Sequence, residues 1–142
     1  MARSRDKAQV NVGQAQHHLG FAGTISLRPS TMIAAIYDWT ASLNRHGFER
    51  IYWFNGHGGN IATITAAFSE IYADWSLKRA GANTPPVRCT LRNWWELDGI
   101  TALCREMFPV GEGSHATASE VSVTYAAYPE AIKRVEMTPK IA

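Results

Sequence analysis

The pattern of hydrophobic and polar positions in the first half of the chain alternates between helical and extended periods. Residues 29–46 begin with Pro29 and Ser30, which suit the first turn of a helix, and continue with apolar side chains at steps of three and four. Gly47 is placed to end this helix as the residue after its carboxyl cap. Residues 50–54 (RIYWF) are β-branched and aromatic and precede a glycine-rich turn, a pattern typical of a buried strand.

The second half continues this alternation. Residues 61–79 repeat large apolar side chains at helical spacing, and we expect Asn60 to cap the helix that they predict. Residues 80–86 (AGANTPP) indicate a loop and residues 87–91 (VRCTL) a second strand. Residues 97–107 and 117–128 predict two further helices, the last of them stopped by Pro129.

This order of elements predicts the fold class. Strands that alternate with helices of this length favour βαβ crossovers, and therefore a mainly parallel sheet with helices on both faces. We expect one α/β domain over residues 1–142, with a three-layer α/β/α arrangement. In such sheets, ligands bind at the carboxyl ends of the strands.

Composition and charge narrow the class of partner. The chain has 142 residues, 46% of them hydrophobic, but no apolar stretch of the ~20 residues needed to span a bilayer. Its net charge is +2 and its basic residues are dispersed, so the sequence predicts no nucleic-acid or membrane partner and favours a small molecule. Cys89 and Cys104 lack metal-binding spacing, and no apolar segment follows the basic start of the chain, which together indicate reduced thiols and a cytoplasmic location.

The strongest candidate site is the turn at residues 55–60 (NGHGGN), directly after the first predicted strand. Its glycines allow a sharp bend and leave room beside the backbone, and His57 is its chemically active side chain, so His57 is a candidate metal ligand. The turn is explained equally well as a plain βα connection whose histidine binds a carbonyl. A phosphate or nucleotide site at the helix start is a weaker alternative, because the spacing matches neither GxGxxG nor GxxxxGK[ST].

A second candidate is the segment at residues 113–120 (GSHATASE), in which His115 precedes Glu120 by five positions at a helix start. Imidazole and carboxylate groups are ligands that zinc, manganese and iron accept, and a histidine can also move a proton. Residues 117–120 also fit a capping box, with Thr117 as the N-cap and Glu120 reaching back to its amide. The spacing leaves both interpretations open.

An aromatic pair follows the second predicted strand. Trp94 and Trp95 lie where its carboxyl end is expected, so one of them could wall a substrate pocket. A core or subunit-interface pair explains them equally well. Glu96 is adjacent to the pair, and the sequence assigns it no role.

Taken together, NGHGGN at residues 55–60 and HATASEVS at residues 115–122 resemble two motifs of the creatininase (creatinine amidohydrolase) family, in the family's order. The segment at residues 18–27 (HLGFAGTISL) is also similar to the family's HxxFPGTxSL element, and the resemblance covers residues 10–133. It implies an α/β/α layered fold and a homo-oligomer. It also implies hydrolysis of a cyclic or formyl amide C–N bond by activated water, at a two-metal site that binds zinc, manganese or iron.

The resemblance also implies roles for individual residues. His57 would be a metal ligand, Glu120 a metal ligand or a nearby catalytic carboxylate, and His115 the proton shuttle to the leaving nitrogen. We expect five further residues to line the site: His18, Asn55, Asn60, Trp94 and Trp95.

The chain departs from the family pattern in two places. Family members carry an earlier E-x-H segment followed by an aspartate, whereas the early part of this chain offers only Asp6 as a carboxylate. We therefore expect a chain that lacks the family's amino-terminal strand and helix, self-associates and binds metal weakly. Creatininase itself has a tyrosine and a ligand glutamate where this chain has Gly58 and Gly59, which favours a deformylase-like substrate. The alternative is a truncated, non-catalytic relative that keeps the fold and binds a small molecule or partner subunits.

Overall fold

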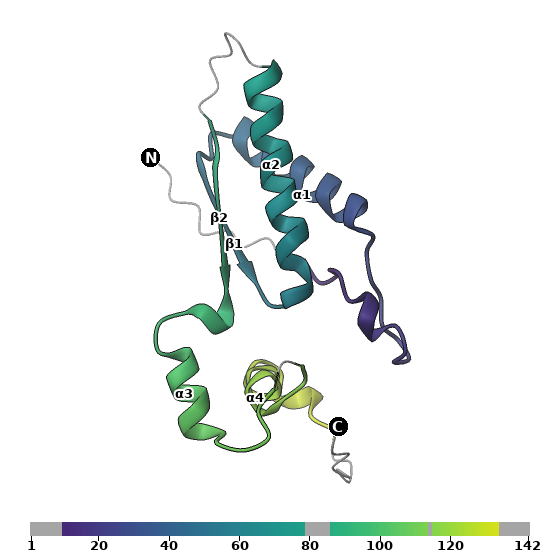
Figure 1. Cartoon of the computed structure of the whole chain (residues 1–142), viewed down its shortest axis with the longest axis vertical. Helices are drawn as coiled ribbons and strands as arrows, with labels where there is room; N and C mark the ends of the chain where they lie inside the picture. The colour runs from purple at the N-terminus through teal and green to yellow at the C-terminus, as the bar shows by residue number, and fades with distance from the viewer. Residues whose placement is uncertain (1–9, 79–85, 114, 134–142) are drawn as a thin grey trace. The chain divides into compact units, whose positions relative to one another are not determined.

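A computed structural model describes residues 10–78, 86–113 and 115–133, and divides the chain into two compact units, one ending at Glu96 and one beginning at Leu97. The first unit contains η1 (Gln16–His18), α1 (Pro29–Arg45), β1 (Arg50–Asn55), η2 (Gly58–Asn60), α2 (Ile61–Lys78), β2 (Arg88–Asn93) and η3 (Trp94–Glu96), where η marks a 3-10 helix (Figure 1). The second contains α3 (Ile100–Met107), α4 (Ala118–Ala127) and η4 (Pro129–Ala131).

Most predicted elements lie within the described residues, although Asp6, Arg79 and all but the last residue of the predicted loop at residues 80–86 lie outside them. The expected single domain stays a prediction, because two compact units of one chain can form one domain or two. No helix within the described ranges is both long enough and apolar enough to cross a membrane.

The expected α/β class is confirmed by the first unit. Here β1 and β2 pair in parallel, with Arg50 opposite Arg88 at one end and Asn55 opposite Asn93 at the other. Both α1 and α2 lie on the same side of this pair, as Figure 1 shows. Of the three expected layers, the described part of this unit therefore contains the sheet and one helical layer.

The core lies between the two helices and one face of the sheet. Its buried apolar side chains come from α1, from α2 and from the residue before β2: Met32, Ile36, Ile64, Ala67, Ile71 and Val87. They recur at helical spacing because the buried stripe of each helix repeats every three or four residues. Burying each isoleucine stabilises the fold by roughly 1.5–3 kcal/mol.

The end of α1 confirms the role predicted for Gly47. This glycine has a φ of 89°, the left-handed conformation that favours glycine, and its amide donates to the Asn44 carbonyl at 2.9 Å. The amide of Phe48 donates to the Leu43 carbonyl at 3.1 Å. These two bonds form a Schellman motif, which turns the chain sharply into β1.

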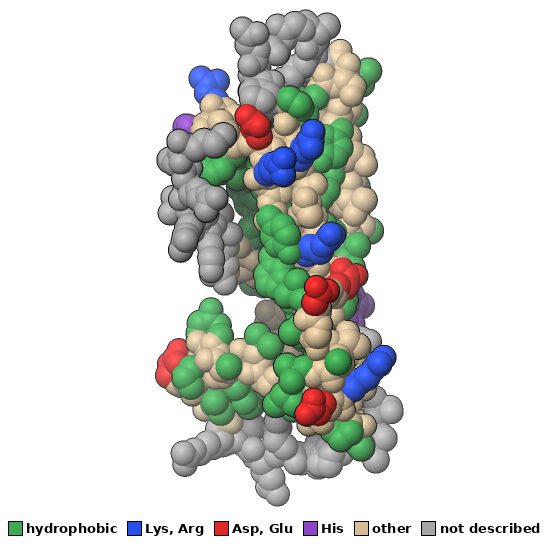
Figure 2. Space-filling view, turned by 90° about the vertical axis from the view of Figure 1, so that its left-hand side faces the viewer, with side chains coloured by type: hydrophobic (Ala, Val, Ile, Leu, Met, Phe, Trp, Pro, Cys, Tyr) green, Lys and Arg blue, Asp and Glu red, His purple; other side chains and the backbone are tan. Residues whose placement is uncertain are grey.

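Side chains alternate along the strands, so the other sheet face carries a different set: Arg50, Tyr52, Phe54, Arg88, Thr90 and Arg92. This outer face, visible in Figure 2, is exposed and mixes apolar with basic groups. Tyr52 is 57% exposed and Phe54 60% exposed, and their rings stack with centroids 6.5 Å apart. Such an exposed aromatic pair is typical of a surface that another layer or subunit covers.

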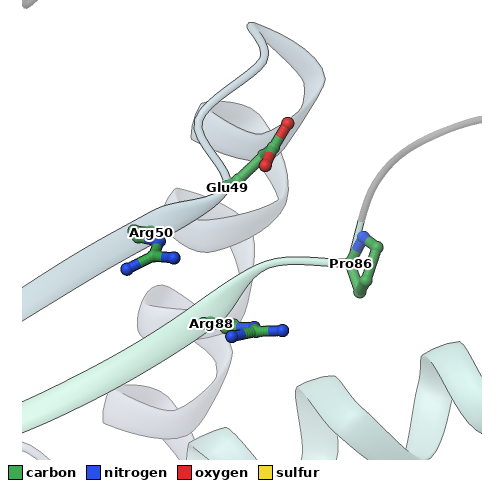
Figure 3. A pocket seen from close by; sticks show the side chains of 4 residues that line it. All are labelled: Glu49, Arg50, Pro86 and Arg88. Carbon is green, nitrogen blue, oxygen red and sulfur yellow. The ribbon is translucent and has the colours of Figure 1, made fainter.

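The amino-terminal end of the sheet carries a pocket lined by Glu49, Arg50, Pro86 and Arg88 (Figure 3). Because Arg50 and Arg88 are register partners at the starts of their strands, their guanidinium groups extend from neighbouring backbones. The NGHGGN turn follows the opposite end of β1. This pocket is therefore separate from the candidate site.

In the second unit, both predicted helices are present, but each begins later in the chain than predicted. Gly99, with a φ of 81°, turns the chain before α3, so this helix begins at Ile100 rather than at residue 97. Thr117 is the N-cap of α4, and Pro129 begins η4 directly after the helix has ended. Cys104 in α3 and Cys89 in β2 are free cysteines.

Candidate metal centre

The first asparagine of the NGHGGN turn fixes the end of β1. The side chain of Asn55 is 4% exposed, and its amide nitrogen donates to Asn93 Oδ1 at 2.7 Å and to the His57 carbonyl at 2.8 Å. Its oxygen accepts from the His57 amide and from Asn60 Nδ2, both at 3.1 Å. These four bonds use both donors and both acceptor positions of the side chain, so Asn55 holds the turn rigidly around His57.

The last asparagine of the turn makes a contact that the sequence did not predict. Asn60 ends η2, and its side-chain oxygen accepts from the backbone amide of Gln14 at 2.8 Å, 46 positions earlier in the chain. Asn60 directly precedes the first residue of α2, and its predicted role as the cap of that helix stays a prediction. Its side chain also joins the segment before η1 to the turn that carries His57.

Close packing explains one glycine of the turn. A Cβ at Gly59 would lie 2.7 Å from the Gln14 carbonyl oxygen and 2.8 Å from His57 Nε2, both too short for real contacts. Gly56 and Gly58 have open space around them, and none of the three glycines has a positive φ. Gly59 is therefore required for packing within the protein, and the turn uses no positive φ at its glycines. The predicted room for an approaching ligand stays a prediction.

Three imidazoles gather beside this turn. The ring centroids of His17 and His57 lie 5.4 Å apart, those of His18 and His57 5.6 Å, and those of His17 and His18 4.1 Å. Each histidine offers a nitrogen, and these nitrogens all lie within 4.8 Å of one another. Among the described residues, this is the one group of three or more histidine, cysteine or carboxylate side chains close enough to hold a metal ion. We call it the histidine cluster.

The segment before α1 fixes η1 and its two histidines through its own hydrogen bonds. The Leu27 amide donates to the Gly13 carbonyl at 2.9 Å, and the Ala15 amide donates to Ser26 Oγ at 2.9 Å. The Thr24 hydroxyl donates to the His18 carbonyl at 2.9 Å. These bonds close the segment into a loop that presents its histidines toward His57.

The sequence identified His18 and His57 but missed His17. The available signal was the histidine doublet at positions 17 and 18, directly before the element that resembles HxxFPGTxSL. His57 and His18 are half-buried, whereas His17 is exposed. A mixed environment of this kind suits a metal site at a protein surface, where the ion must enter from water.

The end of β2 lies at the same edge of the sheet, because the two strands are parallel. Trp94 and Trp95 follow it in η3, both half-buried, with ring centroids 6.1 Å apart in an edge-to-face arrangement. Asn93 donates its side-chain amide to Glu96 Oε2 at 2.8 Å. Glu96, to which the sequence assigned no role, is thus tied through Asn93 to Asn55 and the His57 turn.

His115 and Glu120 belong to the second unit. The carboxylate of Glu120, at the third position of α4, accepts a hydrogen bond from the Ala116 amide rather than from Thr117. The expected capping box is therefore not formed in its standard arrangement. His115 is exposed. The roles that the resemblance implies for these two residues, in one site with His57, stay predictions.

Glu112 makes the side-chain contacts at the start of α4, where a capping box over residues 117–120 was one of two interpretations. Its carboxylate accepts from the Ser119 hydroxyl, from the Ser119 amide at 3.4 Å and from the Thr117 hydroxyl at 3.3 Å. A carboxylate beside the first amides of a helix stabilises its positive end. The start of α4 is thus held by a residue that the sequence did not single out.

The fold and the histidine cluster define an α/β protein with a metal-competent centre at the carboxyl edge of its parallel strands. The model of the creatininase family, described as creatinine amidohydrolase, matches residues 8–141, and the chain belongs to this family. A creatinine amidohydrolase of Pseudomonas putida is 26% identical over 130 residues, which cover 89% of this chain and 47% of the relative.

Solved structures agree with this assignment. A mutant creatininase complexed with creatine has a TM-score of 0.69 at 25% identity, over 86% of this chain and 49% of that one. A creatinine amidohydrolase has a TM-score of 0.65 at 27% identity, over 84% and 47%. A mutant creatininase of the Zn-Zn type has a TM-score of 0.62 at 26% identity, over 80% and 44%. The chain spans about half the length of the relatives it matches.

Proposed function

We propose that this chain forms part of a metal-dependent amidohydrolase that cleaves the C–N bond of a cyclic or formyl amide in a small molecule. One observation carries this proposal: His57, at the carboxyl edge of the sheet in a creatininase-family chain, lies within a cluster of three imidazoles. Ligand sites of parallel α/β sheets lie at this edge. A structurally similar creatininase is of the Zn-Zn type, which supports a divalent metal as the cofactor.

The residues around His57 fit a divalent cation of the zinc, manganese or iron class, because neutral imidazole nitrogens are ligands that these ions accept. Such an ion, once bound, would make water a nucleophile near neutral pH and polarise the amide carbonyl. The chain's own contribution is to hold His57 in place. Asn55 does so through both the amide and the carbonyl of that residue.

His115 and Glu120 complete the proposed chemistry. We assign His115 the delivery of a proton to the leaving nitrogen, and Glu120 a place as a metal ligand or as a carboxylate beside the site. Both assignments rest on the resemblance of residues 115–122 to the family's motif. A positioned acid or base of this kind contributes about 10²–10⁴-fold to a rate.

The proposed substrate pocket is lined by His18, Asn60, Trp94 and Trp95. Asn55 has no hydrogen-bonding capacity left for a substrate, so we assign it a positioning role. Gly58 and Gly59 leave this edge without large side chains, which favours a formyl amide over creatinine. We further propose that the protein acts in the cytoplasm as a homo-oligomer, since its cysteines are free and its outer sheet face is exposed.

The experiment joins this chain to an amino-terminal segment, with Glu-x-His and a downstream aspartate, taken from a creatininase relative. Hydrolysis of formyl amides and of creatinine is then followed by release of formate or creatine, with and without added zinc, manganese or iron. We expect metal-dependent cleavage of a formyl amide. A chimera that folds and binds metal but cleaves neither class of amide would establish the alternative, a non-catalytic family member.

A further inference from the structure

We infer that His17, His18 and His57 together hold one divalent cation, in a centre of three imidazoles contained within the first unit of the chain. The inference deepens the proposed function, on whose metal requirement it rests, by naming the ligands. Two of these histidines come from η1 and one from the turn after β1. Sequence spacing alone would have paired His57 with Glu120 and left the metal with too few ligands.

The distances between the candidate nitrogens of the histidine cluster are close to the distances between ligand nitrogens around a bound ion. Zinc binds imidazole nitrogens at about 2.0–2.1 Å in a tetrahedron, which sets ligand nitrogens roughly 3.3 Å apart. The candidate nitrogens lie within 4.8 Å of one another, so closure around an ion requires movements of at most about 1.5 Å. Side-chain rotation supplies such movements without a change of backbone.

The two supports of the centre are tied to each other. The turn that carries His57 is held by Asn55, and Asn60 of the same turn accepts the Gln14 amide at 2.8 Å, two residues before η1. The backbone of His18 is itself tied to Thr24. Because the ligands are already gathered before the ion arrives, binding requires little ordering of the chain.

Close packing keeps these supports together. Gly59 lies beneath His57 Nε2 and against the Gln14 carbonyl, where a larger residue would separate the turn from η1. Gly13 faces the side chain of Asn60, and a Cβ there would overlap it. One glycine in each loop therefore allows close contact with the other loop. Together they let the loop with His17 and His18 pack against the loop with His57.

The ligand set also selects the class of ion. Three neutral imidazoles suit zinc, cobalt, nickel and copper, whereas magnesium and calcium prefer oxygen ligands. Three protein ligands leave a fourth tetrahedral position for water or a substrate, which is the pattern of catalytic rather than structural zinc sites. We therefore expect the centre to bind zinc and not magnesium.

The test uses the 142-residue chain after treatment with a chelator. Zinc, cobalt and magnesium are titrated in turn by calorimetry, and cobalt binding is also followed by its visible absorption, which is intense for four-coordinate ions. We expect one zinc or cobalt ion per chain and no binding of magnesium. His17→Ala, His18→Ala and His57→Ala should each weaken zinc binding at least 10–100-fold, which is about the loss seen when even a residue that merely supports a ligand is removed.

The matched control is His46→Ala, which removes an exposed imidazole at the end of α1, outside the histidine cluster. It should bind zinc as the native chain does. Far-ultraviolet circular dichroism and thermal unfolding without metal confirm that each variant is folded. A folded native chain that binds no zinc at millimolar concentration would overturn the inference, as would one ion shared by two chains.

Glu120→Ala separates this inference from the proposed function. If zinc affinity falls in Glu120→Ala and His57→Ala but not in His17→Ala and His18→Ala, the three-imidazole centre is wrong and a metal-dependent hydrolase stands. If affinity falls in the three histidine variants alone, the centre is supported. An active chimera then supports the proposed function as well, and an inactive, zinc-loaded chimera contradicts only that function.

Discussion

Asn55 and Asn93 are register partners at the carboxyl ends of β1 and β2, and their side chains are hydrogen-bonded to each other at 2.7 Å. Each is 4% exposed. The pair begins a polar network that runs in one direction to Glu96 and in the other to the turn with His57 and on to Gln14. Through this network, the strand ends determine where the histidine cluster lies.

Asn55→Asp tests the network with almost no change of shape. The aspartate has no donor for Asn93 Oδ1 or for the His57 carbonyl, and its charge would be buried. Each buried polar group left without its partner costs about 1–3 kcal/mol, so we expect the free energy of unfolding in urea to fall by at least about 2 kcal/mol. Asn11→Asp, at an exposed position, is the control and should change it by less than about 0.5 kcal/mol. Equal stability of the two variants would contradict the network's role.

Gly59→Ala tests the contact between the turn and the segment before η1. The new Cβ would meet the Gln14 carbonyl oxygen at 2.7 Å, so we expect a loss of roughly 1–3 kcal/mol of stability and a weaker affinity for zinc. Gly58→Ala adds the same methyl group one residue earlier, where nothing lies within 4 Å. Thermal unfolding should distinguish the two variants clearly. A tolerated Gly59→Ala would mean that the two loops are not packed as described.

The sequence predicted the helices and strands well because their boundaries depend on local chemistry. The left-handed Gly47, the apolar stripe of α2 and the aromatic β1 each act over a few residues. The histidine cluster could not be predicted in this way, because it depends on the bond between Gln14 and Asn60, which are 46 positions apart. Thr117 is the N-cap of α4 as expected. The hydrogen bonds at this helix start were not predicted for a related reason, since Glu112 lies seven positions before its partner Ser119.

Cys89 provides a test of the packing of β2 against the helices. Burial raises the pKa of its thiol above the ordinary value of 9.0, although the neighbouring polar groups of Trp53, Tyr72 and Thr40 oppose the shift. At any pH below this raised pKa, a smaller fraction of Cys89 is thiolate than in an exposed cysteine, so its alkylation should be slow. In the variant Cys104→Ser, we expect the alkylation rate of Cys89 to rise with a midpoint above pH 9.0 in the folded chain. A midpoint at or below the value measured in urea would contradict this burial.

The outer face of the sheet predicts self-association. Tyr52 and Phe54 expose more than half of their surface there and stack on each other. We expect light scattering at micromolar concentration to give a mass well above the 15.7 kDa of one chain. Replacing both aromatic residues by lysine should lower that mass, whereas Ala66→Lys, on an exposed position of α2, should not. A native chain that scatters as a monomer would contradict the expected oligomer.

The proposed mechanism is tested in the chimera by comparing how much bound metal and how much activity two variants lose. His57→Ala removes a proposed metal ligand, so we expect both bound metal and amide hydrolysis to fall by orders of magnitude together. His115→Ala removes only a proposed proton donor, so the metal should stay bound while the rate falls about 10²–10⁴-fold. The pH dependence then separates the two, because loss of a proton donor removes the alkaline limb of the rate profile. Activity that survives His57→Ala would remove the NGHGGN turn from the mechanism, and loss of metal in His115→Ala would make that histidine a ligand instead.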